Sequence, residues 1–121
     1  MAREEMPRSE KPIEEQAREQ TGQQQVTLRI DERNMTTCYA NAFRTNGSAE
    51  EVMLDFGVNE VRPAAQPQGQ PEIHFQVKDR VILNYYSAKR LAIALGNLVN
   101  RYEEQFGKLE LDVTKRRKAT T

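Results

Sequence analysis

The chain has 121 residues, 37% of them hydrophobic, and its 18 basic and 18 acidic residues cancel to a formal net charge of zero. This length allows one domain, and a body so close to neutral lacks the broad positive field of a dedicated nucleic-acid binder. The sequence has no apolar run of membrane-spanning length, and the single cysteine, Cys38, excludes an internal disulfide framework. The charged N-terminal residues predict no signal peptide, so we expect a cytoplasmic protein.

Residues 1–24 are rich in Glu, Gln and Arg and contain few large apolar side chains. Such a composition buries too little apolar surface to offset the entropy of ordering the backbone. We therefore expect a disordered N-terminal tail, in which Ile13–Gln20 forms at most a transient helix.

Two strands are expected at the start of the ordered domain, which we place at residues 25–113. Val26, Leu28 and Ile30 alternate with polar residues, the pattern of a strand with one buried face. A second strand is expected over about Thr36–Arg44. It has apolar groups on both sides, Cys38, Ala40 and Ala42 on one and Tyr39 and Phe43 on the other. Such a strand is typical of a sheet centre or an interface.

Two further strands follow a turn at Asn46-Gly47-Ser48. In the third strand Val52, Leu54, Phe56 and Val58 point to one side, and a proline-rich loop then runs from Arg62 to Pro71. In the fourth strand, over 73–85, the apolar residues all occupy odd positions, which predicts that they share one face. Asp79 interrupts them and predicts a turn or bulge around Lys78–Arg80 that splits the strand in two.

One amphipathic helix is expected from about Ala88 to Phe106, with Ser87 as its N-cap and Gly107 as a left-handed C-cap. Its charges oppose the helix dipole, because Lys89 and Arg90 lie near the positive end. Either these two residues meet an acidic group on a partner or they are a tolerated surface feature. Beyond the helix, Leu109, Leu111 and Val113 alternate, which favours a short strand or edge pairing with a neighbouring chain. Residues 114–121 form a basic tail, expected to be disordered.

These elements predict an α+β fold: an antiparallel sheet of about four strands, with one long C-terminal amphipathic helix packed on one face.

Catalytic chemistry is poorly supported. The only histidine, His74, lies on the less apolar side of its strand, and Cys38 lies on an alanine-rich one. Two such residues do not make a zinc site, and the glycines have no phosphate-loop spacing. We therefore expect no catalytic, cofactor-binding or metal site. Carboxylates from separate elements converging on one point remain an alternative.

Four segments form a combined motif: Val52-Met-Leu-Asp-Phe-Gly57, Val81-Ile-Leu83, Ser87-Ala-Lys-Arg-Leu91 and Tyr102-Glu-Glu-Gln-Phe-Gly107. Together they resemble a family known only as domain of unknown function 3467, found in bacteria and archaea. The resemblance covers about Val26 to Gly107 and implies that Gly57, Lys89, Arg90 and Gly107 are pattern positions. It implies no activity. The order of elements is also similar to the SecB export-chaperone fold, in which a helix packs on a four-stranded antiparallel sheet in dimers and tetramers.

The leading functional hypothesis is an oligomeric protein-binding or assembly module, chaperone-like, whose partners are itself and an unidentified protein. One helix covers only one face of a sheet, so apolar groups on the other face indicate an interface. The interface residues we predict are Cys38, Tyr39, Ala40, Ala42, Phe43, Lys89 and Arg90. The alternative is association with nucleic acid through the basic tail, Lys115, Arg116, Arg117 and Lys118.

Overall fold

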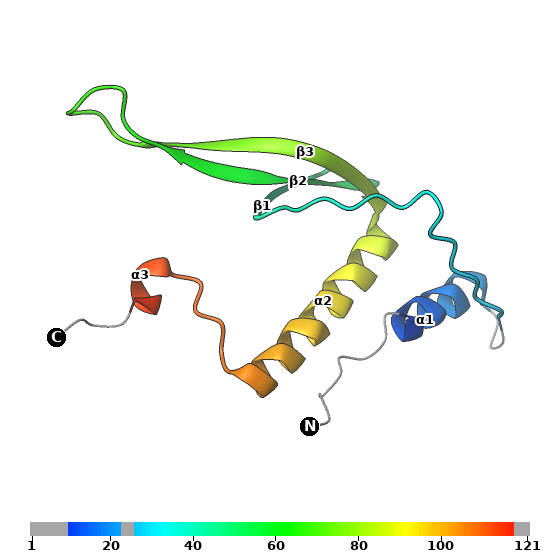
Figure 1. Cartoon of the computed structure of the whole chain (residues 1–121). Helices are drawn as coiled ribbons and strands as arrows, with labels where there is room; N and C mark the ends of the chain where they lie inside the picture. The colour runs from blue at the N-terminus through cyan, green and yellow to red at the C-terminus, as the bar shows by residue number, and fades with distance from the viewer. Residues whose placement is uncertain (1–9, 23–25, 118–121) are drawn as a thin grey trace. The chain divides into compact units, whose positions relative to one another are not determined.

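The computed structural model describes residues 10–22 and 26–117, and within them the fold is α+β (Figure 1). The chain divides into two compact units. One comprises Arg29–Lys89 and contains the sheet; the other comprises the described residues up to Leu28 together with those from Arg90 onward. No helix among the described residues is long and apolar enough to cross a membrane.

Three antiparallel strands form the sheet, in the order β1-β2-β3: β1 is Ala42–Gly47, β2 is Glu51–Arg62 and β3 is Glu72–Asn84. The first hairpin pairs Ala42 with Gly57 and Gly47 with Val52. Its turn is held by Ser48, whose Oγ accepts hydrogen bonds from the backbone N–H groups of Glu50 and Glu51, both at 3.2 Å. The predicted turn therefore lies slightly later than expected, because Asn46 and Gly47 still belong to the ladder.

Four strands were expected, and the described residues form three. Val26–Ile30 is not a strand, and the second predicted strand is ordered into the sheet only from Ala42. Asn41 explains that boundary. Its backbone N–H donates to the Gly57 carbonyl at 3.0 Å, but its side-chain Oδ1 accepts a hydrogen bond from the backbone N–H of Asn59 at 2.8 Å. A side-chain oxygen thus replaces the next ladder acceptor, and the regular pairing ends.

A bulge in β3 changes which residues share a face. Phe56 pairs with Asp79 but Gly57 pairs with Val77, which leaves Lys78 without a partner on β2. The bulge confirms the predicted irregularity at Lys78–Arg80, although the strand continues through it. Because one extra residue reverses the alternation, Ile73, Phe75 and Val77 lie on the opposite face from Val81 and Leu83. The expectation that all these apolar residues share one face was wrong.

Paired residues in an antiparallel sheet point to the same side, so the register defines two faces. The first, which we call the Phe43 face, contains Phe43, Thr45, Val52, Leu54, Phe56, Val58, Val81 and Leu83. The second, the Arg44 face, contains Ala42, Arg44, Met53, Asp55, Gly57, Phe75, Val77, Arg80 and Ile82. Each face therefore carries a group of apolar side chains beside polar ones, among them Gln76 and Asp79 on the Phe43 face and Asn46 and Asn59 on the Arg44 face.

Gly57 is required by the close approach of β3 to β2. It is one of two buried residues in the described part of the chain. A Cβ at this position would overlap the backbone oxygen of Gln76 and lie 2.9 Å from the Phe75 ring. The aromatic ring of Phe75 thus occupies the space that a side chain at position 57 would need.

Helix α2, Tyr85–Phe106, begins three residues earlier than predicted. Asn84, not Ser87, caps it, because Asn84 Oδ1 accepts the N–H of Ser87 at 2.8 Å. At the other end Gly107 has φ 98° and its N–H donates to the Glu103 carbonyl, which confirms the predicted C-cap. The Glu103 carboxylate accepts the N–H of Leu109 at 2.9 Å, which gives this acidic group a partner at the negative end of the helix dipole.

Two shorter helices flank these elements. Helix α1, Glu10–Thr21, contains the segment for which a transient helix was expected. Helix α3, Val113–Arg116, follows Asp112, whose carboxylate accepts the N–H of Thr114 at 3.0 Å. The predicted short strand over Leu109–Val113 is absent from the chain itself, since Leu109–Asp112 pairs with no strand and Val113 starts a helix.

A strand glycine and a helix glycine allow a matched test of the register. We expect Gly57→Ala to lower the free energy of unfolding by about 1–3 kcal/mol, because backbone atoms must shift to admit the methyl group. Gly96, inside α2, has nothing within 4 Å of the position that a Cβ would take, so Gly96→Ala is expected to raise it by roughly 0.5–1 kcal/mol. Urea unfolding of both variants measures the difference, and equal behaviour would contradict the register at Gly57.

Candidate functional site

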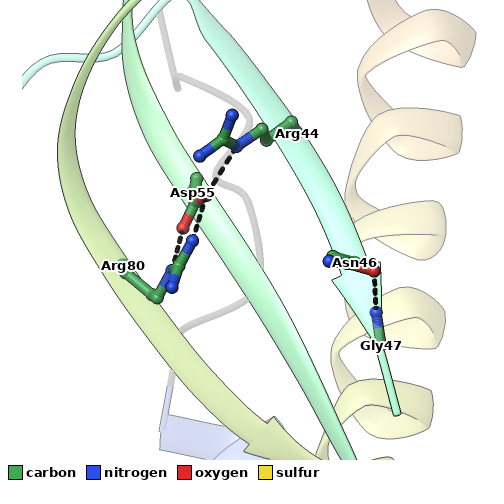
Figure 2. Close-up of polar contacts among 5 residues, drawn as sticks. All are labelled: Arg44, Asn46, Gly47, Asp55 and Arg80. Carbon is green, nitrogen blue, oxygen red and sulfur yellow. Dashed lines mark hydrogen bonds and ion pairs between the residues drawn. The ribbon is translucent and has the colours of Figure 1, made fainter.

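A three-residue ion cluster occupies the centre of the Arg44 face. Arg44, Asp55 and Arg80 are directly opposite one another on β1, β2 and β3. Arg80 donates from Nε to Asp55 Oδ1 at 2.7 Å and from Nη2 to Oδ2 at 3.0 Å, and Arg44 donates from Nε to Oδ2 at 2.7 Å. Figure 2 shows both guanidinium groups converging on the one carboxylate. The cluster therefore links all three strands through side chains.

The Asp55 side chain is buried, whereas its two arginine partners are exposed to solvent. Its side chain is 3% exposed, against 59% for Arg44 and 50% for Arg80. Hydrogen bonds from Arg80 and then Arg44 hold the pKa of Asp55 well below its usual range. One carboxylate between two guanidinium groups leaves a net charge of +1 at an exposed point.

Hydrogen-bond donors remain available at this point. Arg80 uses Nε and Nη2 in a bidentate contact, while Arg44 uses only Nε, so both terminal amino groups of Arg44 have no partner among the described residues. Three apolar residues lie near the charge on the same face, Met53, Ile82 and Val77, and Asn46 is a polar neighbour on β1. Such a cluster is suited to receive a carboxylate or another oxyanion from a molecule that also covers the apolar groups.

Sequence reasoning did not select Arg44, Asp55 or Arg80. A carboxylate in the middle of an otherwise apolar strand was the available signal, because such a residue needs a charged partner when it is buried. Which arginines supply that partner depends on the register of both hairpins.

The predicted interface residues lie in three places. Cys38, Tyr39 and Ala40 belong to the segment before β1, where Tyr39 is 71% exposed and a hydrogen bond to Asp79 raises the pKa of the exposed Cys38 thiol. Ala42 and Phe43 begin β1 and point to opposite faces of the sheet. The structure therefore does not place these five residues on one surface.

Lys89 and Arg90 lie in the second turn of α2. Lys89 is exposed, and Arg90 Nε donates to Glu19 Oε1 of α1 at 2.7 Å, so Arg90 has an acidic partner in its own chain. Of the predicted nucleic-acid contacts, Lys115 and Arg116 are exposed in α3, Arg117 follows it, and Lys118 lies outside the described residues.

His74 and the acidic residues form no metal centre within the part of the chain that is described. His74 Nε2 lies 2.9 Å from Glu72 Oε2, with the His74 side chain 42% exposed. No group of three or more His, Cys, Asp or Glu residues there has a geometry able to hold a metal ion.

Comparison with protein families identifies the chain. A family model described as "Protein of unknown function (DUF3467)" matches residues 3–111, and the chain belongs to this family. The match confirms the resemblance carried by the strand and helix motifs and extends it toward both ends. No curated protein and no solved structure matches the chain. The likeness to the SecB layout therefore stays a prediction.

Replacing Asp55 tests the cluster. Asp55→Asn leaves two guanidinium groups facing each other without a carboxylate, so we expect a clear drop in melting temperature at pH 7. Asp31→Asn removes a carboxylate from an exposed pair with Arg33 and is the matched control, expected to change the melting temperature little.

The cluster also predicts a pH dependence. Since the pKa of Asp55 is lower in the folded chain, the stability that Asp55 contributes is present above its unfolded pKa of about 4 and is lost on acidification below it. Unfolding between pH 7 and 2 should therefore show a shallower acid decline for Asp55→Asn than for the wild type. Parallel profiles would contradict the assignment.

Proposed function

We propose that this DUF3467 member is a small, non-enzymatic module that self-associates and binds other proteins, acting as a cytoplasmic chaperone-like or assembly factor. The observation that supports it is the burial pattern. Among the described residues no hydrophobic side chain is buried, and 22 large hydrophobic side chains are exposed. Exposed apolar side chains in this number are typical of a surface that binds another molecule.

The energetic reason is general. Ordering each residue costs roughly 1–2 kcal/mol of conformational entropy, and burial of a large apolar side chain returns about 1.5–3 kcal/mol. Side chains that stay exposed contribute little of this burial free energy. Neither of the two units contains a buried hydrophobic residue among those described, so neither has a core of its own. Association with a second copy supplies the missing burial at sufficient concentration.

Helix α2 carries the most regular of these exposed surfaces. Its apolar side chains recur at three- and four-residue spacing and each exposes between 37% and 65% of its surface: Leu91, Leu95, Leu98, Val99, Tyr102 and Phe106. The Phe43 face of the sheet is its natural counterpart, with Phe43 itself 70% exposed. The expected packing of the helix on one sheet face, in a SecB-like layout, belongs to this proposal.

The environment of Asp55 supports the non-enzymatic part. A general acid or base needs a pKa near the working pH. Asp55 is the buried carboxylate of the described chain, and its two arginine partners move its pKa in the opposite direction from the one that catalysis near neutral pH requires.

Self-association is tested by sedimentation. At about 100 µM the wild type is expected to sediment as a dimer or larger, with a melting temperature that rises with concentration. Leu98→Lys, on the apolar side of α2, is expected to weaken association at least about ten-fold, because a lysine is placed where an apolar contact is needed. Asn97→Lys adds the same side chain at an exposed polar position of the same helix and is the control. A wild type with monomer mass throughout would refute the proposal.

Nucleic-acid association is the second candidate, favoured by the exposed cations that α3 brings within one turn, Lys115 and Arg116, followed by Arg117. We expect such binding to be non-specific and strongly weakened by salt. Binding to duplex DNA at about 50 mM salt that disappears when residues 114–121 are deleted would establish it. No binding under these permissive conditions would exclude it.

A further inference from the structure

The outer edge of β1 is open. In the sheet β1 pairs with β2 alone, so one row of its backbone N–H and C=O groups has no ladder partner among the described residues. Open edges readily accept an added strand. The opposite edge, on β3, is less regular because the bulge at Lys78 interrupts it. The edge of β1 is therefore the better template.

The side chains of β1 specify what a strand added to this edge must carry. On one face Phe43 is 70% exposed, and Thr45 follows it. On the other face Arg44 is 59% exposed, and its two terminal amino groups lack partners within the described chain. A fitting segment needs apolar side chains on the Phe43 face and a carboxylate on the Arg44 face.

Residues Leu109-Glu110-Leu111-Asp112 have this pattern. They follow α2 without regular secondary structure, and the backbone of Asp112 is already extended, with φ −83° and ψ 116°. Leu109 is 42% exposed and Leu111 is 86% exposed. Asp112 caps α3, whereas the Glu110 carboxylate holds only the N–H of Asp112, at 3.1 Å. Glu110 is thus the carboxylate available to a new partner.

We propose that Leu109–Asp112 of one copy adds as a strand to the outer edge of β1 of a second copy, with Glu110 bound by Arg44. This inference rests on the proposed self-association and names the contact that directs it. In either strand direction the alternation puts Leu109 and Leu111 on the Phe43 face when Glu110 is on the Arg44 face. Since every copy carries both the segment and the edge, two copies exchange the contact reciprocally.

A protein carboxylate is favoured over a nucleic-acid phosphate at Arg44. The sheet unit, residues 29–89, contains seven basic and eight acidic residues and so has no positive field to attract a polyanion. Met53 and Ile82 give the cluster apolar neighbours on the same face, which suits a mixed apolar and acidic segment.

Charge exchange in trans tests the contact. Arg44→Glu and Glu110→Arg each place like charges together, and each is expected to weaken self-association at least about ten-fold in sedimentation equilibrium. In an equimolar mixture, both reciprocal contacts are again of opposite charge, so the affinity should return to within about three-fold of wild type. Glu104→Arg makes the same charge change on exposed α2 and should have no effect. Failure of the mixture to recover, or a Glu110→Arg chain that associates like wild type, would overturn the proposal.

Arg44→Glu also removes a hydrogen bond from Asp55, so a second measurement uses Glu110→Arg alone, which leaves the cluster intact. Hydrogen exchange of the β1 amides should slow with rising concentration in the wild type and in Glu104→Arg, but not in Glu110→Arg. If protection of the β1 amides does not depend on protein concentration, the edge is paired within one chain. That result would overturn the proposed contact between copies. If the wild type is oligomeric and Glu110→Arg does not weaken its association, only this contact is contradicted. If the wild type is monomeric, the proposed function is contradicted as well.

Discussion

The contact of Asp55 with two arginines determines much of the sheet. A carboxylate sealed at the centre of β2 requires compensation, and Arg44 and Arg80 provide it from both neighbouring strands. A shift of either hairpin by one residue would move an arginine to the other face and leave Asp55 unpaired. The cluster therefore favours one register over its alternatives, and the net charge it leaves is the most distinctive chemical feature of the surface.

Apolar side chains lie on both sides of the sheet, and the bulge at Lys78 is one reason. It divides the hydrophobic residues of β3 between the two faces, where an uninterrupted strand would have placed them on one. Together with the exposed stripe of α2, this distribution leaves the described chain without a buried hydrophobic residue. The proposed self-association would remove these surfaces from water.

Family membership gains a physical basis from two positions of the Leu54-Asp-Phe-Gly57 motif. Asp55 is the acceptor of the ion cluster, and Gly57 admits the close approach of Gln76 and Phe75. Arg90, a third pattern position, pairs with Glu19. Each of these roles stabilises the fold, which gives the motif a structural meaning.

Local patterns in the sequence were enough to predict the α+β class, the glycine cap after the helix that ends at Phe106, the strand around Phe56 and the irregularity near Lys78. They were enough because alternation, helical spacing and turn residues act over a few neighbouring residues. Local patterns could not reveal that Val26–Ile30 lacks a strand partner, that Asn84 caps α2, or that Arg44 and Arg80 meet at Asp55. Those features depend on which residues lie opposite one another across two hairpins, and one unpaired residue at Lys78 was sufficient to reverse the faces. Only the tertiary structure decided them, because pairing register is a property of strands together and not of any strand alone.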